Sequence, residues 1–210
     1  MILSHEIIKR EIQKGLPGKQ AQWQMSSRAM TRENISRMPG PDATEAAVLI
    51  ALYPRSGSVF TVFIQRPDYN GFHSGQISFP GGRKEPADND STATALREAC
   101  EEVGIDPKKI SVAGTLTPLF IPVSNMVVTP VAGWTDTKPA FVRQPGEVEY
   151  IIEAELKRFL DPSIVKTRSM EVRGEIRVIK YFDYDGHVIW GATAMILNEL
   201  LEIIRRGNLI

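Results

Sequence analysis

The stretch FPGGRKEPADNDSTATALREACEEVGI, residues 79–105, joins a glycine-containing turn to one amphipathic helix. Gly81 and Gly82 let the backbone approach a ligand closely, because neither residue carries a Cβ atom. Alanine and leucine side chains then favour a helix over 91–103. The expected caps of this helix are Asp90 or Ser91 at its start and Gly104 at its end.

The two faces of this helix differ in character when successive residues are placed about 100° apart. The face expected to pack against the protein carries Ala93, Ala95, Leu96, Ala99, Cys100 and Val103. The other face carries one guanidinium and three carboxylates, from Arg97, Glu98, Glu101 and Glu102. Like charges three or four residues apart disfavour a helix by about 0.2–0.5 kcal/mol per pair. We therefore expect a group outside the helix to compensate the carboxylates.

Carboxylates at positions i, i+3 and i+4 bring several oxygen atoms into one small volume. Such a site suits Mg²⁺ or Mn²⁺, which commonly join protein carboxylates to substrate phosphates. The sequence therefore predicts a divalent-cation site beside Gly81 and Gly82, and a solvated charged face is the alternative. A zinc site is not expected, because the chain has one cysteine and its three histidines are scattered.

Apolar and β-branched runs elsewhere in the chain predict a mixed sheet flanked by helices. Strands are expected over 45–53, 59–65, 111–120, 126–134, 148–156, 176–184 and 187–190. A Ser56-Gly57 turn joins the first two strands into a hairpin. Further helices are expected over 4–14 after a capping Ser4, within 16–30, and over 192–206. We divide the chain into a helical extension, 1–40, which packs on a main domain, 41–210.

The composition is that of an ordinary globular protein and disfavours several functional classes. The 210 residues include 25 Lys and Arg and 25 Asp and Glu, so no global charge indicates a nucleic-acid partner. No apolar run approaches the length of a membrane span, and the N-terminus does not have the pattern of a signal peptide, so no membrane partner is expected. The single cysteine, Cys100, favours a reducing compartment and a cytoplasmic location.

The pattern of the glycines and the helix resembles the signature of the Nudix hydrolases. In that signature a glycine and a glutamate precede R-E-U-x-E-E-x-G-U, where U is apolar. The fixed places of its last part are matched by Arg97, Glu98, Ala99, Glu101, Glu102, Gly104 and Ile105. The segment between Gly82 and Arg97 is one residue longer than in the common form, and Asp88 stands where the first glutamate falls. In this respect the chain is similar to the coenzyme A pyrophosphatase branch of the family.

Other segments also resemble that branch. Arg66, Gly75 and Phe79 keep the spacing of its upstream pattern, whereas Pro67 and Gly71 depart from it. The downstream segments that look similar are LTPLFIPVSNMVVTPVAGW, PGEVE and IWGATAMIL. The resemblance implies an α+β fold in which helices and a mixed β-sheet form an α/β/α sandwich.

The resemblance also implies roles for the carboxylates. The expected ligands of Mg²⁺ or Mn²⁺ are Glu98, Glu101 and Glu102, with the carbonyl of Gly82, or alternatively that of Gly81, as a further ligand. Glu98 is also expected to act on the attacking water. Glu147 is expected to add a catalytic carboxylate from a later loop.

Further residues are implied around these carboxylates. Arg97 is expected to orient them and to tie the helix to its preceding loop through Asp88 or Glu85; a surface ion pair is the alternative. The candidate substrate contacts are Arg66, His73, Gln76 and Arg83. For His73 and Gln76, a solvated position in a surface loop is equally open.

The activity implied is hydrolysis of a diphosphate linkage in a nucleoside-diphosphate derivative. Coenzyme A or an acyl-coenzyme A is the favoured substrate, with 4′-phosphopantetheine and adenosine 3′,5′-bisphosphate as products. An ADP-ribose or nucleotide-sugar pyrophosphatase is the first alternative, because Gly71 stands where the branch has an arginine. A nucleotide-sensing domain without turnover is the second, and the three retained glutamates disfavour it. The expected partner is thus a small-molecule nucleotide, and a homodimer remains open.

Overall fold

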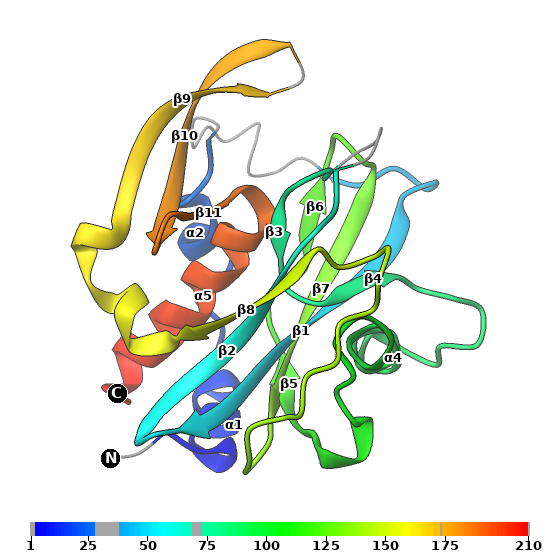
Figure 1. The fold of residues 1–210 in the computed structure, drawn as a ribbon, viewed down its shortest axis with the longest axis vertical. Coiled ribbons are helices and arrows are strands. Elements are labelled where there is room, and N and C mark those ends of the chain that lie inside the picture. The colour runs from blue at the N-terminus through cyan, green and yellow to red at the C-terminus, as the bar shows by residue number, and fades with distance from the viewer. Residues whose placement is uncertain (1–2, 28–37, 69–72, 173, 210) are drawn as a thin grey trace.

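The computed structural model describes residues 3–27, 38–68, 73–172 and 174–209. These residues form a large mixed sheet, a smaller three-stranded sheet, and helices on both faces of the large sheet (Figure 1). In the large sheet β1 and β7 run parallel, whereas the other paired strands run antiparallel. The predicted α+β sandwich around a mixed sheet is therefore confirmed.

The large sheet has the strand order β3-β2-β1-β7-β5, and β4 pairs with β1, β6 with β7 and β8 with β2. The strands are β1 (Thr44–Arg55), β2 (Ser58–Gln65), β3 (Ile77–Ser78), β4 (Gly81–Arg83), β5 (Ser111–Thr115), β6 (Leu119–Ile121), β7 (Met126–Trp134) and β8 (Tyr150–Glu155). β1 is covered on both faces, which explains its nearly continuous apolar sequence. The predicted hairpin turn at Ser56 and Gly57 is confirmed, and both residues have positive φ, 51° and 79°.

The α-helices of the described residues are α1 (His5–Gln13), α2 (Gly18–Trp23), α4 (Ser91–Val103) and α5 (Gly191–Gly207). Short 3-10 turns are η1 (Pro107–Lys109), η2 (Leu156–Leu160) and η3 (Pro162–Ile164). The bounds of α4 are those predicted. Asp90 caps its start by accepting a hydrogen bond from the Ala93 N–H at 2.8 Å, and Gly104 ends it in the left-handed conformation.

The large sheet separates two apolar cores. On one face, Ala95, Ala99 and Val103 of α4 pack against a small cluster that includes Ala47 and Leu49 of β1. These small side chains let α4 lie close to the sheet. The larger core on the other face contains α5 together with aromatic side chains from Phe63, Phe79, Phe159 and Phe182. α4 therefore lies on the face of the large sheet from which it reaches Gly81 and Gly82 at the start of β4.

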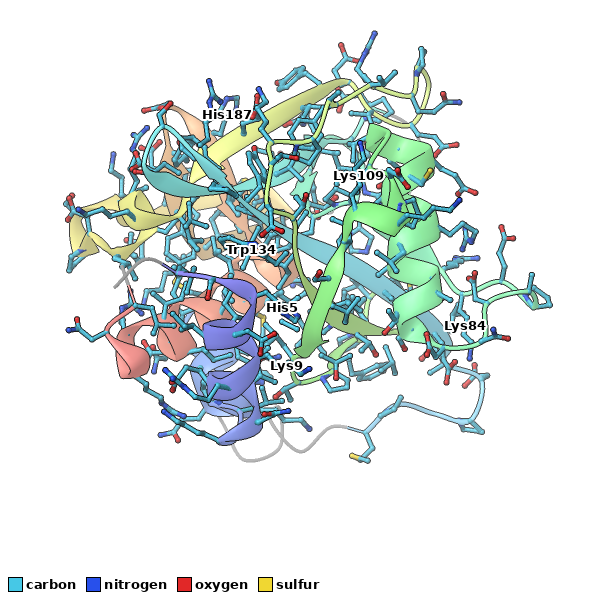
Figure 2. All side chains as sticks on the ribbon, turned by 90° about the horizontal axis from the view of Figure 1, so that it is seen from below. His5, Lys9, Lys84, Lys109, Trp134 and His187 are labelled. Carbon is cyan, nitrogen blue, oxygen red and sulfur yellow. The ribbon has the colours of Figure 1, made fainter. Side chains whose placement is uncertain are left out.

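α1 covers the edge strand β5. The Nε2 atom of His5 lies 3.2 Å from the carbonyl oxygen of Val112, and Ile8 of the same helix is buried (Figure 2). Ser4 occupies the N-cap position as predicted, but its side chain makes no capping hydrogen bond. The helix is thus fixed by packing against the sheet more than by its cap.

α2 is joined to α5 by polar contacts around a wholly buried carboxylate. Glu199 accepts hydrogen bonds from the side chain of Gln22 at 2.8 Å and from the Thr117 hydroxyl at 2.6 Å. α2 therefore packs on the rest of the chain, and the division into an extension, 1–40, and a main domain, 41–210, stays a prediction. Residues 28–37 lie outside the described residues.

The small sheet has the order β11-β10-β9, with β9 (Val165–Val172), β10 (Glu175–Tyr184) and β11 (His187–Trp190). The β9–β10 ribbon projects beyond the body of the protein (Figure 1). β9 was not predicted, because polar and mostly exposed residues dominate it and leave no apolar alternation. The strand predicted over 111–120 divides into β5 and β6, since residues 116–118 interrupt the ladder that both strands form with β7. None of the helices in the described residues has the length and apolar character needed to cross a bilayer.

Candidate active site

The floor of the candidate site is formed by Gly81 and Gly82, the first two residues of β4, which are called the glycine turn below. β4 pairs with the central strand β1 so closely that a Cβ atom on Gly81 would lie 2.6 Å from the Cα of Val48. No side chain fits there, which explains the glycine. The backbone of Gly81 is used in two directions: its N–H donates to Glu102 and its carbonyl accepts from Arg66. The turn therefore presents bare backbone to α4.

Glu102 is a buried carboxylate that receives little compensation. The residue is only 2% exposed. One carboxylate oxygen accepts the Gly81 N–H at 2.8 Å, and the other lies 3.7 Å from Nη2 of Arg66. Burial raises the pKa of Glu102 to about 7, although Arg66 and the Gly81 N–H act in the opposite direction. As an anion, Glu102 would be stabilised by a further positive charge.

Glu98 lies directly over Gly82, one helical turn before Glu102. A Cβ atom on Gly82 would come within 2.5 Å of the carboxyl carbon of Glu98. Burial raises the pKa of Glu98, and the neighbouring Arg97 partly offsets this effect. Because residues four apart project from the same side of a helix, the two carboxylates reach the glycine turn together.

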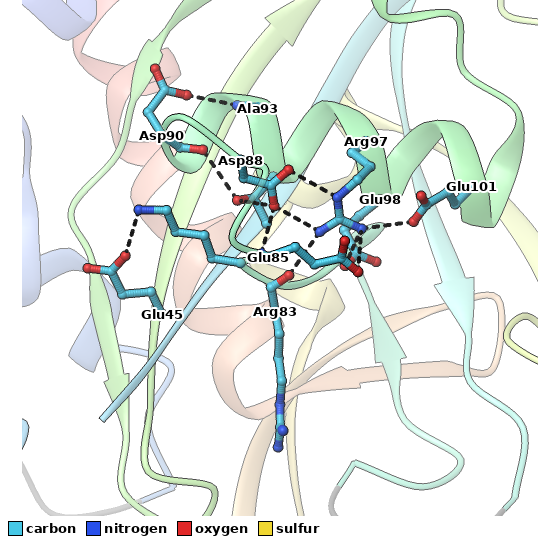
Figure 3. Close-up of polar contacts among 11 residues, drawn as sticks. Glu45, Arg83, Glu85, Asp88, Asp90, Ala93, Arg97, Glu98 and Glu101 are labelled. Atoms are coloured by element: carbon cyan, nitrogen blue, oxygen red, sulfur yellow. Dashed lines mark hydrogen bonds and ion pairs between the residues drawn. The ribbon is translucent and has the colours of Figure 1, made fainter. Parts of the chain in front are cut away.

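Arg97 fastens α4 to the loop that precedes it (Figure 3). Its guanidinium donates to both oxygens of Asp88, at 3.1 and 2.9 Å, and lies 3.8 Å from Glu85. These hydrogen bonds hold the pKa of Asp88 well below its usual range. Arg97 also contacts Glu98 at 3.1 Å and Glu101 at 2.9 Å. The structure thus contains the predicted tie between helix and loop, mainly through Asp88.

The buried face of α4 is rotated relative to the prediction. The buried residues of the helix are Thr94, Ala95, Ala99, Glu102 and Val103. Glu102 therefore points inward, whereas the three carboxylates were expected to share one outer face. Cys100 was expected on the packed face but is exposed, because it lies about 100° around the helix from Ala99. The hydrogen bond from Gly81 to Glu102 explains this orientation.

Two of the predicted carboxylates lie outside the Glu98 and Glu102 pair. Glu101 is exposed and its carboxylate is bound to Arg97. Glu147 is exposed in the loop before β8. Its negative charge adds to the effect of burial in raising the pKa of both Glu98 and Glu102. Glu147 therefore lies near the pair, without a direct contact that would assign it a role.

Three of the predicted substrate contacts are held together beside the turn. The backbone N–H of Arg66 donates to the carbonyl of Gln76 at 3.0 Å. The Nδ1 atom of His73 lies 3.1 Å from Oε1 of Gln76, and its Nε2 atom lies 3.4 Å from the hydroxyl of Ser124. His73 has a φ of 66°, a conformation that is strained for a residue other than glycine and that marks a constrained loop. Burial lowers the pKa of His73, which favours a neutral ring.

The structure adds Ser124 to this polar group and gives Arg83 a backbone contact with Arg97. Ser124 joins this group although no motif singled it out, since only the folded chain brings it next to His73. The side chain of Arg83 is exposed and extends away from the carboxylates (Figure 3), and its contact with substrate stays a prediction. The carbonyl oxygen of Arg83 accepts a hydrogen bond from Arg97 at 2.9 Å. Gly71 lies outside the described residues.

The donor set of the site suits a divalent cation of the magnesium type. Within the described ranges, no group of three or more His, Cys, Asp or Glu side chains is arranged to hold a metal ion. Mg²⁺ often takes only one or two protein carboxylates, however, and completes its coordination with water and substrate phosphates. The pair of Glu98 and Glu102 beside bare backbone fits that pattern. Glu101 as a third ligand stays a prediction.

The sheet, the glycine turn and α4 identify the family of the chain. The family model described as the NUDIX domain matches residues 43–182, which contain all three. The chain belongs to the Nudix family of hydrolases, whose members generally use divalent metal ions.

Named relatives agree with this assignment. The chain is 39% identical to the Arabidopsis thaliana protein named Nudix hydrolase 15, mitochondrial, over 72% of this chain and 55% of that protein. It is 36% identical to the Mus musculus protein named peroxisomal coenzyme A diphosphatase NUDT7, over 66% of this chain and 58% of that protein. The chain thus spans little more than half the length of these relatives. The solved structure of the Nudix hydrolase RenU from M. smegmatis covers 78% of this chain and 87% of its own, with a TM-score of 0.55 at 14% identity, and it supports the fold alone.

The raised pKa of Glu102 leads to a prediction about stability without metal. Between the ordinary value of 4.5 and about 7, the folded protein binds more protons at Glu102 than the unfolded chain does. Stability therefore falls as the pH rises through this window. Glu102→Gln, which does not titrate, is expected to be more stable than the wild type at pH 8 by about 1–3 kcal/mol and to lose this advantage at pH 4.5.

Denaturant unfolding in the presence of a chelator measures this difference. Glu101→Gln is the matched control and is expected to bring no comparable gain in stability, because the carboxylate that it replaces is exposed and bound to Arg97. A gain for Glu102→Gln that is the same at both pH values would contradict the assigned burial of the charge.

Proposed function

We propose that this chain hydrolyses the diphosphate linkage of coenzyme A or an acyl-coenzyme A at the turn formed by Gly81 and Gly82. The observation that carries the proposal is the arrangement of Glu98 and Glu102. Both carboxylates reach one glycine turn, and both have pKa values raised by burial. Such a pair is suited to holding a cation against a substrate diphosphate.

The reaction breaks one phosphorus–oxygen bond of the diphosphate. The oxygen of a water molecule attacks one phosphorus, and the bond from that phosphorus to the bridging oxygen breaks. The bridging oxygen leaves on the other phosphate, and a proton of the water passes to a base. Glu98 is the proposed base, because its raised pKa lies closer to the working pH than that of an ordinary carboxylate.

The remaining residues bind and orient. Glu98 and Glu102 would hold Mg²⁺ or Mn²⁺, which supplies charge neutralisation for the diphosphate and makes the attacking water more acidic. Arg97 holds the Glu98 side chain in place and fixes α4 to its loop through Asp88. Glu147, near both ligands, is a proposed additional carboxylate that contacts the substrate complex.

Coenzyme A is favoured over other diphosphates by two observations. The spacing of Arg66, Gly75 and Phe79 resembles the coenzyme A pyrophosphatase branch. One relative of the chain, at 36% identity, is named a coenzyme A diphosphatase. In the structure, His73 and Gln76 of the same segment form a constrained polar group beside Arg66, which suits recognition of a polar part of the substrate.

The test is a panel of substrates with Mg²⁺ or Mn²⁺. Coenzyme A, ADP-ribose, NADH and diadenosine polyphosphates are incubated with the protein and the products are separated by chromatography. We expect 4′-phosphopantetheine and adenosine 3′,5′-bisphosphate from coenzyme A, and at least about 10²-fold slower turnover by Glu98→Gln prepared in parallel. Turnover of ADP-ribose but not of coenzyme A would replace the proposed substrate. Tight nucleotide binding without any turnover would instead indicate a sensing domain.

A further inference from the structure

Arg66 lies at the boundary between the two carboxylates and the loop that carries His73 and Gln76. Its Nη2 atom donates to the carbonyl of Gly81 at 2.9 Å and lies 3.7 Å from a carboxylate oxygen of Glu102. Its Nε atom donates to the hydroxyl of Ser78 at 3.3 Å. The guanidinium is therefore directed at the glycine turn and at Glu102, and the side chain is only about one-quarter exposed, 26%.

The positive charge of Arg66 lies beside Glu102, where a bound divalent cation would also place its positive charge. Among the described residues, Arg66 makes the only ion pair with Glu102. Glu102 is 2% exposed, so water contributes little to its stabilisation. Removing Arg66 would be strongly destabilising, because the buried charge of Glu102 would be left uncompensated, whereas the partly exposed guanidinium can still be hydrated when Glu102 is neutralised. A cation bound at Glu102 would take over this compensation and would at the same time be repelled by the guanidinium.

We propose that Arg66 is a positioning residue that acts as the counter-ion of Glu102 and competes with the divalent cation for it. This role differs from the direct substrate contact that the sequence resemblance implies for Arg66. It rests on the proposed function only in so far as the cation site is the one at Glu98 and Glu102.

The same residue connects the cation site to the loop. The backbone N–H of Arg66 holds the carbonyl of Gln76, while its side chain holds the turn at Gly81. A shift of the guanidinium on cation binding would therefore act on the segment that carries Gln76. If cation binding changes the affinity for a substrate at that segment, thermodynamic reciprocity requires that substrate binding change the affinity for the cation by the same factor.

The test compares Arg66→Met, which keeps the aliphatic stem, with Arg66→Lys, which keeps the charge. At pH 8 with a chelator, Arg66→Met is expected to lower the melting temperature by roughly 4–8 °C. In the absence of substrate it is expected to bind Mn²⁺ about 5- to 20-fold more tightly than the wild type, as measured by isothermal titration calorimetry. Saturating Mn²⁺ should then close most of the gap in melting temperature. Arg66→Lys is expected to lie near the wild type in both measurements.

The outcomes separate a counter-ion from a substrate contact. If Arg66→Met changes the KM for substrate but leaves both the melting temperature in chelator and the Mn²⁺ affinity unchanged, the proposal is wrong.

A second experiment needs no metal and adds Arg66→Met to the Glu102→Gln variant. The fall in melting temperature caused by Arg66→Met should then be much smaller than in the wild-type background. An equal fall in both backgrounds overturns the proposal. If the wild type binds no Mn²⁺, the proposed function fails, and this second experiment still tests the pairing.

Discussion

Glu98→Gln and Glu102→Gln are each expected to lower kcat/KM by about 10²–10⁴-fold while the protein stays folded. The physical reason is that both carboxylates reach the glycine turn from one side of α4. Glutamine keeps the shape of each side chain and removes its charge, so the loss would report on cation binding and, at Glu98, on proton transfer. Steady-state kinetics with coenzyme A and a range of Mg²⁺ concentrations measure the effect.

Glu101→Gln provides the matched control on the same helix. Glu101 is exposed and its carboxylate is bound to Arg97. We expect a loss of less than about tenfold, since only one exposed ion pair is removed. If Glu101→Gln lowers kcat/KM as much as Glu98→Gln does, Glu101 contributes as much to cation binding as Glu98. Full activity of both Glu98→Gln and Glu102→Gln would show that the site has been misassigned.

Gly82→Ala is expected to reduce kcat/KM by about 10²-fold with a small change in thermal stability. A Cβ atom at this position would lie 2.5 Å from the carboxyl carbon of Glu98, so the Glu98 side chain must move. The flexible end of a glutamate can move at little energetic expense, which preserves the fold. Its displacement from the turn, however, removes the alignment on which the reaction depends. Kinetics together with thermal denaturation measure the two effects separately.

Gly81→Ala is the informative comparison for this variant. The added methyl group would meet the backbone of β1, 2.6 Å from the Cα of Val48, and backbone cannot move aside as a side chain can. We expect Gly81→Ala to lower the free energy of unfolding by more than about 2 kcal/mol. If Gly82→Ala is destabilised as much as Gly81→Ala, or if it keeps full activity, the close packing of Glu98 on the turn is contradicted.

The parts of the fold that the sequence predicted well are those fixed by local chemistry. α4 begins and ends where Asp90 and Gly104 supply the expected caps. The β1–β2 hairpin turns at Ser56 and Gly57, which adopt the positive φ that a tight hairpin requires. The tie from Arg97 to Asp88 was also foreseeable, since Asp88 stands at a place of the family signature. In each case a few neighbouring residues determine the outcome.

The parts that the sequence did not predict depend on contacts between distant segments. Glu101 and Glu102 are adjacent on the polar side of the helical wheel, yet one is exposed and the other is buried. The difference arises because the Gly81 N–H, 21 residues away, binds Glu102. The approach of Ser124 to His73 likewise exists only in the folded chain. The pairing of Arg66 with Glu102 also depends on the folded chain, because no spacing in the sequence brings the residue that follows β2 next to α4.

The most direct test of the account is the position of a bound cation. Crystals grown with Mn²⁺ give an anomalous-difference map that locates the metal without reference to the activity of the protein. We predict a manganese peak between the carboxylates of Glu98 and Glu102 beside the Gly81-Gly82 turn, and its loss in Glu102→Gln crystals. Manganese bound elsewhere, with these two carboxylates unliganded, would show that Glu98 and Glu102 do not form the cation site.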